Sequence, residues 1–89
     1  MKSPMEEEIY VMRRFSTLRE TYNLTGDCGR VCFVAEAAKV IAGISDIPSK
    51  NRWVREAAKL ANISEDAMIL SVCRELAERH HKIQKGGRA

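Results

Sequence analysis

A strongly apolar stretch runs from Val31 to Ile44 (VCFVAEAAKVIAGI), and Glu36 and Lys39 are its only charged residues. These two residues lie three positions apart, so a helix would present them to water as one narrow polar stripe. The rest of such a helix must be covered by other elements, and about fourteen residues are too few to span a bilayer. The pattern predicts the central helix of a small bundle.

The residues before this stretch predict a first helix from about Pro4 to Thr21. Ser3 can cap it, Pro4 suits the first helical position, and Glu6 lies where a capping box places its acid. Apolar side chains then recur at spacings of 4, 3 and 4, which forms one helical stripe of Val11, Phe15, Leu18 and Tyr22. Segment 23–29 (NLTGDCG) has two glycines and several polar turn residues, so it ends this helix.

The ends of the central helix have their own signals. Thr25 or Asp27 is expected to cap its start, since both side chains can accept from a free backbone N–H group. Gly43 is expected to close it in a left-handed conformation, and Ile44 can then fold back onto the last turn.

A third helix is predicted to begin after Asp46, its expected cap, and to run to Ala61. Asn62 is expected to end it, because asparagine tolerates left-handed backbone geometry well. The apolar side of this helix is predicted to carry Ile47, Val54, Ala57, Ala58 and Ala61.

A fourth helix is predicted after Ser64, which can cap it, with Glu65 and Asp66 in its first turn. It should end at Gly86-Gly87, and residues 84–89 are expected to form a frayed tail. Its predicted stripe consists of Ile69, Val72, Cys73, Leu76, His80 and Ile83.

No alternating apolar pattern or hairpin turn predicts a strand. The connections are short, so successive helices should pack nearly antiparallel or at corners. The predicted fold is therefore all-α: a small four-helix orthogonal or antiparallel bundle in which residues 1–89 form a single domain.

Composition narrows the class of protein. The chain has 89 residues, 45% of them apolar and 30% charged, which is typical of a globular protein, and its net charge of +3 is mild. Its three cysteines are an odd number, and residues 1–10 lack the apolar core of an export signal. These features predict a reduced, cytoplasmic compartment, and no stretch is long enough to anchor the chain in a membrane.

Thiol and metal chemistry are the first candidates for a site. Cys28, Cys32 and Cys73 could be combined with His80 and His81 as a thiol–imidazole pair, but no polar cluster would orient a base. A single C-x3-C at a helix start, without a second close pair of ligands, falls short of a structural zinc pattern. We therefore expect no catalytic residue, no cofactor and no metal, and we expect Cys32 and Cys73 to be small apolar side chains in helical stripes.

A helix-turn-helix is the second candidate, formed by residues 57–76 around Asn62, Ile63 and Ser64. Glu65 and Asp66 oppose DNA binding, because they would meet phosphate at the first turn of the recognition helix. A small DNA-binding regulator remains the alternative function.

Contact with a protein partner is the third candidate. Trp53 lies on the shoulder of the third helix, where it can pack at the edge of the core or anchor an interface. Arg74, Arg79 and Lys82 gather late in the fourth helix, where they also complement the helix dipole. These four residues are the candidates for partner binding.

From Tyr22 onward the chain resembles the helical segment that follows the Toprim core in bacterial DnaG-type DNA primases. That segment opens with an aromatic, Asp, Leu, Ser/Thr and then Gly followed by Lys or Arg, where this chain has 22–30, YNLTGDCGR. Asn23 departs from the usual Asp, Ser45 and Pro48 rearrange a turn, and Trp53 stands where Tyr is common. Further matches, without a gap to Met68, are Ile44, Asp46, Lys50, Trp53-Val54, Ala58 and Ile63-Ser64-Glu65.

The resemblance implies that residues 22–78 form a primase-like helical segment. It implies a role in RNA primer synthesis during DNA replication, by supporting the polymerase core and docking to a DnaB-type replicative helicase. The zinc-binding module and the Toprim acidic cluster that a primase needs are both missing from this sequence. No activity is therefore expected from this chain alone, and contact with nucleic acid is expected to be at most weak or indirect.

Overall fold

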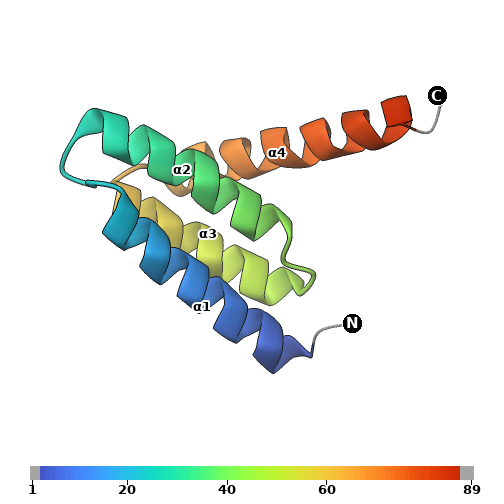
Figure 1. The fold of residues 1–89 in the computed structure, drawn as a ribbon, viewed down its shortest axis with the longest axis horizontal. Coiled ribbons are helices and arrows are strands. Elements are labelled where there is room, and N and C mark those ends of the chain that lie inside the picture. The colour runs from blue at the N-terminus through green and yellow to red at the C-terminus, as the bar shows by residue number, and fades with distance from the viewer. Residues whose placement is uncertain (1–2, 87–89) are drawn as a thin grey trace.

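A computed structural model describes residues 3–86, which fold into four α-helices connected by short turns (Figure 1). They are α1 (Pro4–Thr21), α2 (Asp27–Ala42), α3 (Ile47–Ala61) and α4 (Glu65–Gly86). These described residues contain no strand, so the predicted all-α four-helix bundle is confirmed. None of the described helices is long and apolar enough to cross a membrane.

Helix α2 packs against each of the other three helices, as its apolar sequence predicts. Phe33 and Ile41 are completely buried on it, and the ring of Phe33 meets that of Phe15 on α1 edge to face, with 6.0 Å between centroids. Small side chains let the backbones approach closely. Those that are buried on α2 and α3 are Ala37, Ala38, Ala42, Ala57, Ala58 and Ala61.

Three predicted caps are confirmed. The side chains of Ser3, Asp46 and Ser64 accept hydrogen bonds from the backbone N–H groups of Glu6, Ser49 and Ala67, at 3.2, 3.0 and 3.1 Å. Asn62 has φ 56° and ψ 47°, which is the left-handed geometry expected of it. These residues set the ends of the helices through local hydrogen bonds, which explains why the sequence alone located them.

The expected cap of α2 is wrong. Its N-cap residue is Gly26, which has no side chain to accept a hydrogen bond. Thr25 instead donates its N–H and its hydroxyl to Oδ1 of Asn23, while Asp27 forms an ion pair with Arg30. The Asn23 side chain thus organises the turn and leaves neither Thr25 nor Asp27 available as the cap.

The expected left-handed glycine at position 43 is also wrong. Gly43 has φ −82° and ψ −6°, which is right-handed. The N–H groups of Gly43 and Ile44 donate to the carbonyls of Val40 and Ile41, at 3.1 and 3.0 Å. This tight last turn satisfies both carbonyls and buries Ile44, so no left-handed residue is needed.

Gly43→Ala is therefore expected to stabilise the protein, raising the free energy of unfolding by about 0.4–1 kcal/mol, because alanine restricts the unfolded chain more than glycine does. The added Cβ would lie 3.5 Å from the Val40 carbonyl oxygen, which is ordinary contact. Urea denaturation at 25 °C measures the change. A loss of stability would instead indicate that residue 43 needs a left-handed backbone.

The predicted stripe of α4 is only partly correct. Val72 is buried, as expected, and so is Met68, but Ile69, Cys73, Leu76 and His80 are exposed. Ile83 lies outside the described side chains. Ile69 and Cys73 lie on a different side of α4 from the buried Met68 and Val72, and the second half of the helix extends past the other helices (Figure 1).

The predicted apolar side of α3 is wrong at one position. Ile47 is exposed, because Ser49 faces inward at the first turn of α3 and its hydroxyl donates to Glu8 at 3.0 Å. Helix α4 continues through Gly86, where the sequence predicted its end, and the frayed tail expected at residues 84–89 stays a prediction. Residues 87–89 lie outside the described part of the chain.

Candidate functional site: a groove between α1 and α3

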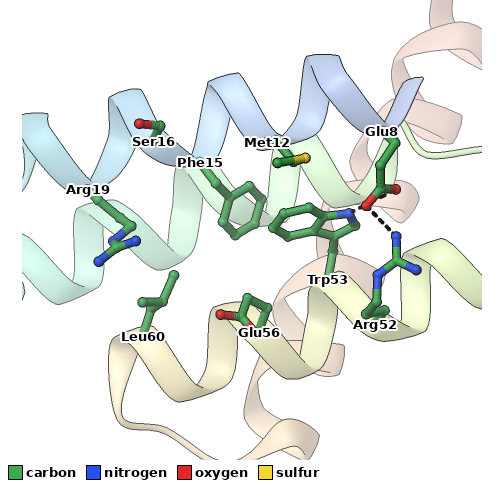
Figure 2. Close-up of a pocket in the computed structure, with 9 residues that line it drawn as sticks. All are labelled: Glu8, Met12, Phe15, Ser16, Arg19, Arg52, Trp53, Glu56 and Leu60. Atoms are coloured by element: carbon green, nitrogen blue, oxygen red, sulfur yellow. Dashed lines mark hydrogen bonds and ion pairs between the residues drawn. The ribbon is translucent and has the colours of Figure 1, made fainter. Parts of the chain in front are cut away.

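A groove of about 400 Å³ opens between α1 and α3, and Trp53 lies at its centre (Figure 2). We call it the Trp53 groove. Both helices contribute to its walls, with α2 behind them. Its lining residues are Glu8, Met12, Phe15, Ser16, Arg19, Arg52, Trp53, Glu56 and Leu60.

The floor of the groove is aromatic. The rings of Phe15 and Trp53 lie 4.7 Å apart at a tilt of 42°, and Phe33 supports Phe15 from behind. Phe15 is buried, whereas Trp53 is half-buried and keeps part of its indole open to solvent. Trp53 therefore packs at the edge of the core, which is one of the two roles that the sequence left open, and the role of interface anchor stays a prediction.

Glu8 closes one end of the Trp53 groove and connects α1 to α3. Its carboxylate accepts hydrogen bonds from the Ser49 hydroxyl at 3.0 Å and from Trp53 Nε1 at 3.5 Å, and it forms an ion pair with Arg52. Charge-assisted contacts of this kind hold a side chain in a defined orientation. They fix the indole so that its polar edge points to Glu8 and its apolar edge lines the groove (Figure 2).

The opposite end of the groove carries Arg19 above Leu60 (Figure 2). Arg19 is exposed, as is Met12 on the α1 wall, where 54% of the residue is accessible. Leu60 is half-buried. The accessible apolar surface is thus bordered by a carboxylate already paired with Arg52 at one end and by a cation at the other.

The basic candidates of the sequence lie elsewhere. Arg79 of α4 donates from Nη2 to the Lys39 carbonyl oxygen at 2.8 Å and pairs with Glu75 at 3.5 Å, so it caps the end of α2. Arg74 is exposed on α4, and the side chain of Lys82 is outside the description. The structure therefore does not bring Arg79 together with Trp53, since these residues belong to different helix junctions.

The sequence did not predict Glu8, Met12 and Arg19 as site residues. Met12 and Arg19 are off the apolar stripe of α1, and Glu8 continues that stripe toward the N-terminus but is charged. Only the separation between α1 and α3 turns them into the wall and ends of a groove, and no local pattern encodes that separation.

The thiol, metal and DNA alternatives can be placed on the same fold. Cys28, Cys32 and Cys73 are all exposed, which contradicts the apolar packing expected of Cys32 and Cys73, and no group of three possible ligands comes together among the described residues. Cys28 and Cys32 are exposed near the start of α2, and Cys73 is exposed on α4.

The turn between α3 and α4 has the hydrogen bonding of a helix terminator, with the Ile63 N–H donating to the Ala58 carbonyl at 3.0 Å. Glu65 and Asp66 are exposed on the following turn, and Glu65 pairs with Arg55 at 3.4 Å. Two accessible carboxylates at this position repel phosphate, so the electrostatic objection to a DNA-reading helix holds on the folded chain.

Comparisons with protein-family models, with curated proteins and with solved structures give no match. The groove is therefore interpreted from its own geometry.

Proposed function

We propose that this chain is a non-catalytic docking module, the helical segment of a cytoplasmic DNA primase that supports RNA primer synthesis and binds the replicative helicase. The resemblance of residues 22–78 to the segment after the Toprim core supplies the family and the partner. The Trp53 groove supplies a surface on which such a partner can dock, and it is the observation that carries the docking part of the proposal.

The motif at residues 22–30, on which the resemblance to the primase segment begins, has a structural role in the turn between α1 and α2. Residues 22–30 form a compact turn in which Gly26 N–H donates to the Asn23 carbonyl at 3.3 Å and Arg30 N–H to the Gly26 carbonyl at 3.1 Å. Gly29 faces the Asn23 backbone so closely that no side chain fits there. This turn therefore requires the glycine of the motif at position 29, whereas the side chain of Arg30 forms an ion pair with Asp27.

The partner surface that fits the groove is an amphipathic helix. Two parallel walls and an apolar floor are the features of helix-in-groove recognition, in which side chains from one face of the incoming helix fill the groove. Aliphatic side chains of the helicase would contact Met12, Trp53 and Leu60. An acidic side chain near one end would pair with Arg19, since Glu8 at the other end is already engaged.

Binding to a purified DnaB-type helicase tests this proposal, and Met12→Glu is the decisive variant. It places a charge on the groove wall at an exposed position, so the fold should persist while the affinity falls at least tenfold. Val31→Glu, at an exposed position on α2, is the matched control and should bind as the unchanged protein does. Fluorescence of Trp53, the single tryptophan, follows both folding and binding.

Equal affinity of Met12→Glu and Val31→Glu for the helicase would overturn docking through the groove. Absence of binding by all three proteins would overturn the helicase as partner. A titration with duplex DNA distinguishes the alternative, because a steep dependence on salt together with sequence preference would favour a DNA-binding regulator.

A further inference from the structure

The exposed side of α4 carries apolar residues at regular helical spacing, and the other helices do not cover them. Ile69 and Leu76 are 46% and 39% accessible, and Cys73 lies between them and is also exposed. The spacings of 4 and 3 place all three on one side of the helix, about a quarter turn from the buried Met68 and Val72. We call Ile69, Cys73 and Leu76 the α4 seam.

Alternation of 4 and 3 is the spacing by which two helices pack along each other as a coiled coil. The α4 helix has 22 residues and is thus about 33 Å long. Its second half projects from the bundle (Figure 1), and from Cys73 to His80 the described side chains are exposed or half-buried. A second helix can therefore lie along the seam without displacing α1, α2 or α3.

The charge distribution along α4 identifies the second helix. Residues 65–73 contain two acidic and no basic residues, a net charge of −2, whereas residues 74–86 contain four basic and two acidic residues, a net charge of +2. An antiparallel copy of α4 brings each acidic start beside a basic end, while a parallel copy brings like charges together. The helix dipoles favour the same orientation.

We propose that the chain forms a two-fold symmetric homodimer by antiparallel packing of α4 against α4 of a second copy along the α4 seam. Cys73 of one copy then packs beside Leu76 of the other, and Leu76 of the first beside Cys73 of the second. The symmetry axis passes between these two contacts. The two bundles lie at opposite ends of the helix pair. The dimer uses a different face from the Trp53 groove and does not depend on the proposed partner.

Sedimentation equilibrium of the full chain in reducing buffer tests the proposal. The expected result is a monomer–dimer equilibrium in which Leu76→Glu weakens association at least tenfold and Val31→Glu, on α2 away from the seam, leaves it unchanged. Circular dichroism confirms that the variants remain folded. A protein that stays monomeric at millimolar concentration, or a Leu76→Glu variant that dimerises normally, would overturn the dimer.

Cross-linking with a short bismaleimide determines the orientation. With Cys28 and Cys32 replaced by serine, Cys73 should link two copies, because it lies near the symmetry axis. With Cys73 also replaced and Asp66→Cys introduced, no link should form, since the two positions would lie roughly 25 Å apart along the antiparallel pair. Efficient linking through position 66 would indicate a parallel pair and would contradict the proposed arrangement.

Discussion

Phe33→Ala is expected to lower the free energy of unfolding by about 3–5 kcal/mol, the usual cost of removing a buried aromatic ring. Phe33 is fully buried on the helix that contacts all the others, and its ring supports Phe15 beneath the Trp53 groove. A domain of this size has a stability of only about 4–13 kcal/mol, so the variant loses a large part of it. Urea denaturation, followed by circular dichroism, measures the loss.

Val31→Ala is the matched control, because Val31 lies two positions earlier on the same helix but is 69% accessible. Its effect should stay within about 0.5 kcal/mol. A Phe33→Ala variant that is as stable as Val31→Ala would show that α2 is not the centre of the core.

Gly29→Ala is expected to destabilise the protein by about 2 kcal/mol or more, although alanine is the better helix former by about 1 kcal/mol. A Cβ at position 29 would lie 2.7 Å from the carbonyl carbon and 2.9 Å from the nitrogen of Asn23, and closer still to its carbonyl oxygen. These atoms belong to the backbone and cannot rotate away. The turn between α1 and α2 must therefore shift, which disturbs the approach of the two helices.

Gly26→Ala separates this clash from a general effect of losing a glycine. A Cβ at position 26 meets nothing within 4 Å, so the variant should cost less than about 1 kcal/mol, mainly through a poorer N-cap residue. Thermal denaturation of both variants gives the comparison. Similar stabilities would mean that the turn around Asn23 adapts to a side chain at position 29.

The Trp53 groove and the proposed dimer contact both result from the way the other helices pack around α2. Helix α2 holds α1 and α3 far enough apart for Trp53 to be reached from solvent, and the second half of α4 extends past the end of α2 (Figure 1). This packing leaves two apolar surfaces accessible: the Trp53 groove between α1 and α3, and the α4 seam.

The amino-acid sequence by itself determined the four helices and most of their ends. Ser3, Asp46, Asn62 and Ser64 act through hydrogen bonds or backbone geometry within a few residues, so no other part of the chain is needed to predict them. The same holds for the central position of α2, because a helix with so few polar side chains packs against its neighbours. The expectation that all of its apolar side chains are covered is wrong at Val31 and Cys32, which are exposed.

Only the tertiary structure decided which apolar side chains became core and which became surface. Ile69, Cys73 and Leu76 have the same spacing as a buried stripe, but the bundle packs against the side of α4 that carries Met68 and Val72 instead. Trp53 becomes the centre of a groove because α1 and α3 rest on α2 with a gap between them. Helical periodicity depends on local spacing, whereas burial depends on which other helix lies opposite, and that is a property of the whole packed chain.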